Sequence, residues 1–305
     1  MEKHRKKLIK NATVFDGHSS GLAQGKKIVI EDDIVTEITA DEVSEENFDE
    51  VFDGTGMVAM PGMTDAHVHM GCLFAKGEFP VDYATVLTVA KCKDALMAGF
   101  TTFRDAGSVS EGLKLAFDEG VLPGSRIYPC GAYISQTCGH GDSEYAHTYR
   151  DIQYRHPSST VLADGVPEII RAVREQFYRG ASHIKLMATE ILNRHEDIRL
   201  LFGTDMMITG PDYQVEQSED IRYYEKRFGT MRALRALTGT ANEVFALTTY
   251  QNPYPKGKIG VLEAGSYADL LLVDGDPTKS VSVLADTDHL RLIMKGGTVY
   301  KNTLC

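Results

Sequence analysis

The sequence lacks a long apolar run and an excess of basic residues. No stretch of about 18 apolar residues occurs, so we expect no membrane span. The basic start, MEKHRKKLIK, is not followed by the apolar run of a signal peptide. The formal net charge is -11, and an acidic chain repels phosphate backbones and anionic lipids. We therefore expect neither nucleic acid nor a membrane as a partner.

Paired cysteine motifs and the common nucleotide and hydrolase loops are also missing. The five cysteines, which show no paired spacing, are Cys72, Cys92, Cys130, Cys138 and Cys305. Without an export signal, free thiols and a cytoplasmic location are the expectation. The chain contains no GxGxxG loop, no P-loop and no GxSxG elbow.

Strand-like segments occupy both ends of the sequence, and strands alternate with helices between them. The end segments are 8–15 and 27–39 at the front, and 268–273 and 290–300 at the back. Neither end is long enough to bury a core alone, so we predict that the two ends pair in one small sheet domain. The alternating middle favours a parallel sheet or a (β/α) barrel.

The middle contains fewer strands than a closed barrel needs. The strand-like segments are 63–68, 100–104, 126–135, 184–188 and 199–204, and the helix-like segments are 81–98, 111–119, 167–179 and 231–247. A closed barrel of this kind has eight strands in about 250 residues. We therefore predict an incomplete α/β barrel with about five of eight strands. The shortfall lies between Lys185 and Asp205, where only one short helix fits.

The segment DAHVH (65–69) is the sharpest motif. Residues two apart on a strand face the same side, so His67 and His69 project together and can chelate one metal ion. Two unrelated histidines are the alternative, because an HxH pattern alone is common. Its place at the end of a predicted first strand, after Pro61-Gly62, favours the metal interpretation.

Asp205 and Lys185 lie at the ends of two later predicted strands. A carboxylate at position 205 can ligate a metal and accept a proton from metal-bound water, although a turn or helix-capping Asp is the alternative. A lysine buried in an apolar strand must be paired, neutral or chemically modified, unless its stem packs and its head reaches water. His183 shares the face of Lys185, two residues earlier.

The loop GHGD (139–142) follows the third strand, at the same end of the sheet. Flanking glycines let the backbone at His140 approach a ligand closely, and a flexible loop with a solvent histidine is the alternative. Cys138 and His140 have the spacing of a metal pair, but no second pair supports it. Four further histidines are expected on the surface or in loops, namely His147, His156, His195 and His289.

These motifs together resemble the metal-dependent amidohydrolase superfamily, in its imidazolonepropionase-like and Xaa-Pro dipeptidase (prolidase-like) branch. The matching segments are MPGMTDAHVHMG (60–71), AGFTTFRDAG (98–107), SQTCGHGD (135–142), GASHIKLMAT (180–189), LLFGTDM (200–206), GVLEAGSYADLLLVDGDP (260–277) and IMKGGTVYKN (293–302). Several independent motifs in the same order are specific for the superfamily, and much less so for the substrate.

The resemblance implies roles for the candidate residues. His67 and His69 match first-strand metal ligands, and Lys185 matches a lysine that, when carboxylated, bridges two divalent ions. Asp205 matches the eighth-strand ligand and proton shuttle, and His140 matches a histidine of the substrate pocket. The implied activity is hydrolysis of a C–N bond in a small amide, a dipeptide such as Xaa-Pro, or a cyclic amide, by a metal-activated water.

The resemblance also implies a domain layout, from which the sequence departs. A (β/α)8 TIM-type barrel would occupy 60–254, and a small β-sandwich would combine 1–59 with 255–305. Family members carry two further histidines, on strands five and six, which have no counterpart here. The sequence therefore resembles a member that lacks an internal block after Thr189.

This departure lowers the number of ions that we expect. His67, His69 and Asp205 would hold one divalent ion, for which zinc is the expected metal, whereas complete members hold two. The alternative to an active hydrolase is an internally deleted, impaired member that acts at most as a metal-binding or partner-binding scaffold. A homo-oligomer is compatible with the sequence.

Overall fold

The computed structural model describes most of the 305 residues. The described residues are 5–70, 81–107, 111–139, 141–142, 160–187, 199–207 and 213–304. Two predicted features, His140 and the block boundary after Thr189, lie outside these residues.

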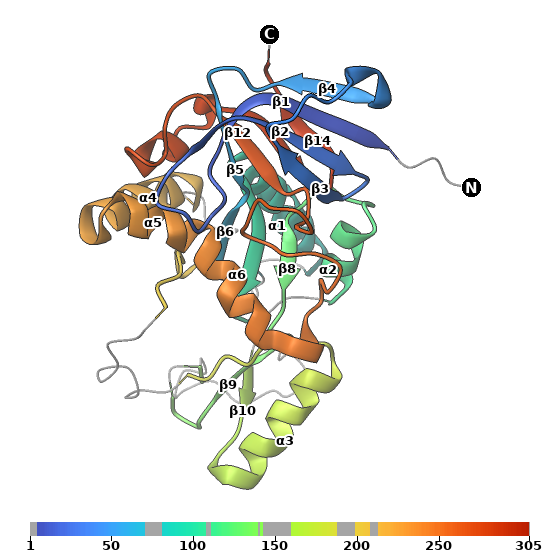
Figure 1. Ribbon diagram of the computed structural model, residues 1–305. Helices are drawn as coiled ribbons and strands as arrows, with labels where there is room; N and C mark the ends of the chain where they lie inside the picture. The colour runs from blue at the N-terminus through green and yellow to red at the C-terminus, as the bar shows by residue number, and fades with distance from the viewer. Residues whose placement is uncertain are drawn as a thin grey trace.

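Strands from both ends of the chain form one mixed sheet, here called the chain-end sheet. Its strands are β1 (Lys6–Val14), β2 (Ala23–Glu31), β3 (Ile34–Thr39), β4 (Glu50–Asp53), β5 (Val58–Pro61), β12 (Leu270–Val273), β13 (Leu290–Lys295) and β14 (Thr298–Asn302). Their order is β14-β13-β12-β5-β1-β2-β3, with β4 paired to β1. Figure 1 shows these blue and red strands together at the top. The two ends pair in one sheet, as predicted, through β12 and β5; the two-sheet sandwich stays a prediction.

Both faces of the chain-end sheet are buried at β12. Leu271 and Val273 belong to an apolar cluster that also contains residues of the neighbouring strands and helices. Leu270 and Leu272, which alternate with them, belong to a second cluster formed mainly by chain-end strands. Successive side chains of a strand point to opposite faces. Burial on both faces therefore explains why this strand is a continuous apolar run.

A second, parallel sheet lies below the chain-end sheet in the view of Figure 1. Its strands, in spatial order, are β11 (Met206–Met207), β6 (Met63–His69), β7 (Phe100–Asp105) and β8 (Arg126–Tyr128). A separate parallel pair consists of β9 (Tyr133–Ser135) and β10 (Thr160–Leu162), and a bridge joins Ile134 to Leu186. The β11–β6 pairing brings a late segment of the chain beside the first strand of this sheet.

Helices follow several of the parallel strands and pack against them. They are α1 (Val81–Met97), α2 (Glu111–Asp118), α3 (Gly165–Tyr178), α4 (Tyr213–Phe228), α5 (Thr230–Leu237) and α6 (Gly239–Phe245). α1 packs on β7, α2 on β8, α3 on β9 and α5 on β6. The alternation confirms an α/β architecture. Among the described residues, no helix combines the length and apolarity needed to cross a membrane.

Several predicted elements differ from the observed ones. The strand expected over 126–135 is divided into β8 and β9, because the chain turns at Gly131 with a φ of 68°. In the described part of segment 184–188, Leu186 forms a single bridge instead of a strand. The segment 199–204 is not a strand, and β11 begins at Met206.

Two helical regions also differ from the prediction. The helix expected over 231–247 ends at Leu237, because Thr238 has φ -134° and ψ -99°, and α6 then starts a new helix. α4 was not predicted at all. Its sequence, YQVEQSEDIRYYEKRF, is mostly polar and lacks a clear apolar stripe.

A buried ion pair joins the parallel sheet to the chain-end sheet. Arg126 on β8 donates from Nε to Oδ2 of Asp269 at 2.7 Å and from Nη2 to Oδ1 at 3.2 Å. The guanidinium carbon of Arg126 lies 3.8 Å from the ring centre of Tyr267, and the backbone N–H of Gly296 donates to Asp269. Asp269 directly precedes β12, so this bidentate contact fixes one sheet against the other.

Candidate metal centre

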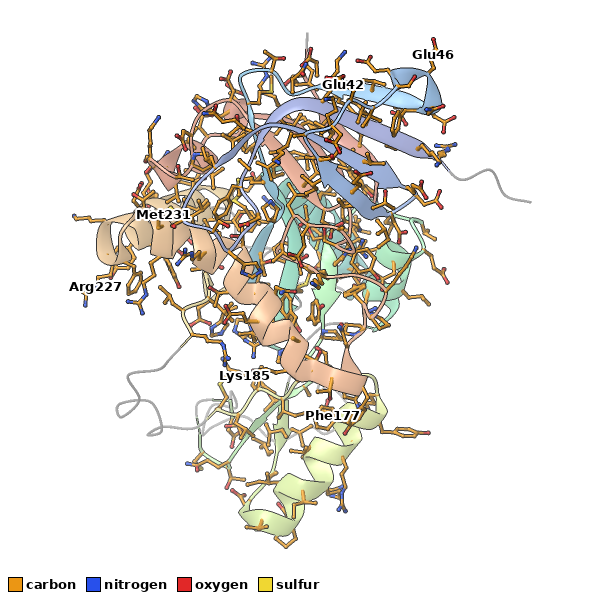
Figure 2. All side chains as sticks on the ribbon, viewed as in Figure 1. Glu42, Glu46, Phe177, Lys185, Arg227 and Met231 are labelled. Atoms are coloured by element: carbon orange, nitrogen blue, oxygen red, sulfur yellow. The ribbon has the colours of Figure 1, made fainter. Side chains whose placement is uncertain are left out.

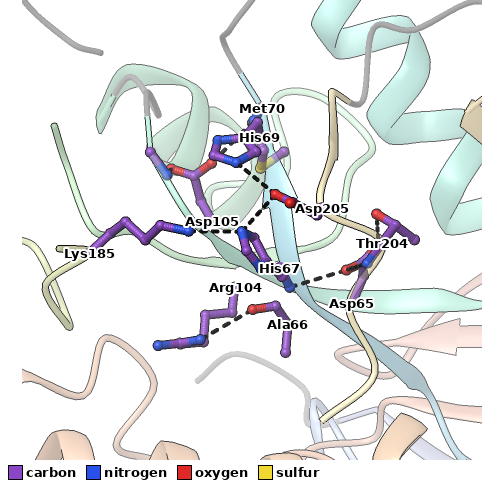
Figure 3. Close-up of polar contacts among 11 residues, drawn as sticks. Asp65, Ala66, His67, His69, Met70, Arg104, Asp105, Lys185, Thr204 and Asp205 are labelled. Carbon is purple, nitrogen blue, oxygen red and sulfur yellow. Dashed lines mark hydrogen bonds and ion pairs between the residues drawn. The ribbon is translucent and has the colours of Figure 1, made fainter. Parts of the chain in front are cut away.

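The end of β6 brings two histidines to the same side of the parallel sheet. Alternate residues Ala66 and Val68 are buried, while the side chains of His67 and His69 are 35% and 12% exposed. The two imidazole centres lie 5.5 Å apart. Figure 3 shows both rings directed toward the carboxylate of Asp205. The period of the strand thus produces the predicted side-by-side pair.

Asp205 supplies the third polar group. Its Oδ1 lies 2.9 Å from Nε2 of His67 and 3.3 Å from Nε2 of His69. The backbone N–H of Asp205 donates to the carbonyl oxygen of His67 at 2.7 Å, which places the carboxylate beside β6. The side chain is 69% exposed, and the residue has a φ of 55°, in the left-handed region that most residues avoid. Such strain is typical of functional positions.

The three groups fit a single divalent cation. One ligand atom from each of His67, His69 and Asp205 lies within 4.8 Å of the others. Tetrahedral zinc with bonds of about 2.0–2.2 Å separates neighbouring ligand atoms by about 3.3–3.6 Å. The His69–Asp205 contact of 3.3 Å lies in this range, and the His67–Asp205 contact of 2.9 Å is shorter. Two imidazoles and a carboxylate are also the donor types that catalytic zinc sites use.

The protonation of the histidines agrees with metal binding. Burial, followed by the positive charge of Lys185, lowers the pKa of His67 to about 4, although Asp205 acts in the opposite direction. Burial also lowers the pKa of His69. Both rings are therefore neutral near pH 7, so their contacts with Asp205 are not ion pairs at that pH. A neutral imidazole is the form that ligates a metal.

Lys185 completes this group of side chains. Its Nζ lies 3.0 Å from Nε2 of His67. Backbone hydrogen bonds of Ile134 to Lys185 and of Met187 to Ile134 hold the segment beside β9. Figure 2 shows Lys185 between the β9–β10 pair and the parallel sheet. The structure therefore brings Lys185 to the histidines and Asp205.

Nε2 of His67 has two neighbours that make opposite demands. The Asp205 carboxylate can only accept a hydrogen bond, whereas the Lys185 ammonium can only donate one. A neutral ring nitrogen either carries a proton or offers a lone pair, so it cannot satisfy both. A cation between His67 and Asp205 would be bound by the nitrogen lone pair and by the carboxylate together.

The other predicted histidines do not join the metal centre. His183 is largely buried, and its Nε2 contacts the carbonyl oxygen of Asp105 at 3.0 Å. Burial lowers the pKa of His183 to about 3, so it acts as a neutral structural group. His289 is exposed and bonds to the carbonyl of Asp274. His140 lies outside the described residues, and so do the loop histidines His147, His156 and His195.

Sequence reasoning missed Asp65 as a functional residue. Its side chain is fully buried on β6, two residues before His67, and its carboxylate accepts hydrogen bonds from the segment that carries Asp205. The same two-residue spacing that identified His67 and His69 places Asp65 on their side of the strand. A buried carboxylate needs partners, and the partners here could not be named from sequence because they lie 139 residues away.

Known proteins share both the sequence pattern and the fold. Residues 58–198 match the model of the amidohydrolase family. This part of the chain is therefore similar to the amidohydrolase family. An ochratoxinase of Aspergillus niger is 34% identical over 152 residues, which are 43% of this chain and 31% of that protein. An imidazolonepropionase of Picrophilus torridus is 27% identical over 176 residues, which are 53% of this chain and 43% of that protein.

The structural comparison extends over nearly the whole chain. A prolidase solved with N-methylphosphonate-L-proline matches with a TM-score of 0.83 and 22% identity, covering 97% of this chain and 100% of that one. At this identity the likeness establishes the fold, which is that of the amidohydrolase barrel proteins. The predicted resemblance to the prolidase-like branch is confirmed. In sequence, the chain spans about a third of the length of the curated ochratoxinase that it matches.

Proposed function

We propose that this chain hydrolyses C–N bonds in small amides or dipeptides, using one divalent cation, zinc, held by His67, His69 and Asp205. The convergence of these three side chains carries the proposal. They come from β6 and from the segment before β11, and their ligand atoms meet within 4.8 Å. The similarity to the amidohydrolase family supports the reaction class.

Each residue has a separate task in the proposed reaction. A bound cation lowers the pKa of water to about 7 and polarises a carbonyl group. His67 and His69 hold it as neutral ligands from a rigid strand. The carboxylate of Asp205 is exposed enough to accept a proton from water and to deliver it to the leaving nitrogen. His140 is proposed to line the substrate pocket.

Lys185 is proposed as the fourth member of the metal centre. Its Nζ lies within hydrogen-bond distance of the His67 ring nitrogen. Carboxylation would convert this nitrogen into a carbamate with oxygen ligands, as the resemblance implies. A second ion would then depend on Lys185 as its main ligand among the described residues, so we propose a single ion.

The relatives guide the choice of substrates. One structural relative carries a proline derivative, and another is described as a Xaa-Pro dipeptidase. A related sequence belongs to an imidazolonepropionase. Xaa-Pro dipeptides are therefore the first substrates to test, followed by N-acyl amino acids and cyclic amides.

Metal content and hydrolysis test the proposal together. The purified protein is stripped with a chelator, reloaded with zinc and assayed for bound metal and for turnover. We expect about one zinc per chain, and loss of metal and turnover in His67→Ala, His69→Ala and Asp205→Ala. His289→Ala, which changes an exposed histidine elsewhere, is the control. Unchanged zinc content in His67→Ala would contradict the proposed centre.

A metal-binding scaffold without turnover is the second candidate. Within the described residues the parallel sheet ends at β11 on one side and β8 on the other, so it does not close on itself. Open edges can bind a partner strand. Zinc retained by His67 and Asp205, with no hydrolysis across the substrate panel, would favour this function over catalysis.

We also propose that the barrel is incomplete, because an internal block is missing after Thr189. The shortage of predicted strands between Lys185 and Asp205 supports this, as does the lack of the two further family histidines. The domain division at residues 59–60 and 254–255 belongs to the same proposal. The genomic reading frame around codon 190 tests the missing block. An intervening coding segment there would support it. An uninterrupted frame in several related genomes would argue against an artefact of gene assembly.

A further inference from the structure

We propose that Asp65 and Thr204 form a positioning pair, which holds the Asp205 carboxylate in place for the cation; this inference rests on the proposed metal centre. Asp65 lies on β6, and Thr204 directly precedes Asp205. Neither side chain is proposed as a metal ligand. Their role is to fix the geometry between two segments that are far apart in the sequence.

The first support is the set of hydrogen bonds at Asp65. Its Oδ2 accepts from the hydroxyl of Thr204 at 3.0 Å, and its Oδ1 accepts from the backbone N–H of Thr204 at 3.3 Å. One carboxylate thus binds both the side chain and the main chain of one residue. Figure 3 shows this double contact next to the two histidines. A two-point contact restricts rotation as well as distance.

The second support is that Asp65 also contacts the histidine strand. Its Oδ1 accepts from the backbone N–H of His67 at 3.2 Å. The Asp65 carboxylate therefore connects His67, one proposed ligand, with Thr204, the residue that precedes Asp205. Moving Thr204 away would shift Asp205 relative to His67, which is the separation that a chelating site must hold constant.

The third support is the backbone strain at Asp205. Its φ of 55° is costly for a residue with a side chain, and such a conformation persists only where the surroundings fix it. Thr204 is anchored on Asp65 immediately before the strained residue, and the N–H of Asp205 bonds to the carbonyl of His67. These contacts determine the conformation on both sides of the peptide unit between Thr204 and Asp205.

Helix α4 contributes a further contact to the pair. Nε2 of Gln217 donates to Oδ2 of Asp65 at 3.4 Å, and both side chains are almost completely buried. A carboxylate without contact with water depends on such donors for its stability. Gln217 therefore supports Asp65 from helix α4, and its effect on the cation is expected to be weaker than that of Thr204.

Cobalt binding tests the inference without relying on turnover. Co²⁺ replaces zinc in the stripped protein, its affinity is measured by titration, and its visible absorption reports the ligand geometry. We expect Thr204→Val to lower the Co²⁺ affinity about 10- to 100-fold, the usual effect of losing a group that orients a ligand. Its absorption spectrum should also change. Thr204→Ser keeps the hydroxyl and should restore both properties.

A matched variant separates positioning from general destabilisation. Thr278→Val removes a comparable hydroxyl–carboxylate bond, from Thr278 to Asp276, far along the chain. It should leave Co²⁺ affinity and absorption unchanged. Circular dichroism and thermal unfolding check that each variant is folded. If Thr204→Val does not fold, Thr204→Ala removes the hydroxyl with a smaller side chain and is expected to act in the same direction.

The possible results distinguish this inference from the proposed function. Co²⁺ binding by the wild-type protein, with unchanged affinity and spectrum in folded Thr204→Val or Thr204→Ala, would overturn the positioning role alone. An equal loss in Thr278→Val would also overturn it. Failure of the wild-type protein to bind Co²⁺, or full binding by His67→Ala, would contradict the metal centre itself.

Discussion

The chain-end sheet and the metal centre are built in different ways. β12 pairs with β5 in a continuous register and with β13 in a register that shifts once, and residues such as Leu270 and Leu292 are completely buried. At the metal centre, β11 has two residues, the Asp205 side chain is mostly exposed, and its backbone is strained. Burial of apolar surface therefore specifies one region, whereas a few polar contacts specify the other.

This difference separates stability from chemistry. Full burial of a side chain such as leucine contributes about 1.5–3 kcal/mol, and the chain-end sheet contains many of them. A residue held in a sparsely populated conformation costs about 1–3 kcal/mol. The well-packed sheet can offset such a cost at the metal centre because the two sheets are joined, by a shared apolar cluster and by the Arg126–Asp269 pair.

The largest expected effect comes from breaking that junction. Asp269→Ala leaves the buried guanidinium of Arg126 without its carboxylate, and removal of one member of a buried pair costs about 3–5 kcal/mol. Urea denaturation should show this loss in the free energy of unfolding. Arg179→Ala, which removes an exposed pair with Glu175, should change it by less than about 1 kcal/mol. Equal effects would show that the sheets do not depend on the junction.

The free energy of unfolding should depend on pH through Lys295, a buried lysine near the same junction. Burial lowers the pKa of Lys295 from 10.5 to about 8, with Asp269 opposing the shift. Between these values the unfolded chain binds more protons, so this group makes stability rise as pH increases from 8 to 10.5. The rise is at most about 3 kcal/mol. Unfolding free energies of the wild-type protein and of Lys295→Met, measured from pH 8 to 10.5, isolate this contribution. The same change with pH in both proteins would contradict the prediction.

A smaller loss of stability, with a larger loss of metal, is expected at Gly203. A Cβ there would lie 2.6 Å from the Cβ of His67 and 3.0 Å from its backbone nitrogen. Gly203→Ala should push the two segments apart, with a cost of about 1–3 kcal/mol and a marked loss of Co²⁺ affinity. Gly25→Ala is a control for adding a methyl group in open space, although it also carries backbone strain at its positive φ. Unchanged Co²⁺ affinity in Gly203→Ala would mean that the close approach is not required.

The smallest effect is a gain in stability. Asp205→Gly places a residue without a Cβ in the left-handed conformation and should stabilise the metal-free protein by about 0.5–1 kcal/mol. The same change should abolish metal binding, because one of the three ligands is lost. Thermal unfolding of the stripped proteins measures the gain. A lower stability than wild type would show that Asp205 also supports the fold.

Much of the architecture could be predicted from local patterns. His67 and His69 follow from the two-residue period of β6, and the pairing of the chain ends follows from strand-like segments too short to form a core alone. The structure also brings Asp205 beside the histidines, directly before the short β11 and not at the end of the strand predicted over 199–204.

The remaining features depend on contacts that no local pattern encodes. The partners of Asp65 come from Thr204 and Gln217, far along the chain. The polar helix α4 was missed because its sequence has no clear apolar stripe. The division of segment 126–135 depends on the positive φ at Gly131, where an added Cβ would meet Gln176.

The distance in sequence between His69 and Asp205 is 136 residues. A cation held by both would act as a cross-link between these distant segments, and at 100 times its dissociation constant it would add about 2.7 kcal/mol to the stability of the folded state. A proteolytic fragment ending before residue 199 would retain two imidazoles without the carboxylate. Retention of the ion after gel filtration would therefore distinguish intact molecules from clipped ones.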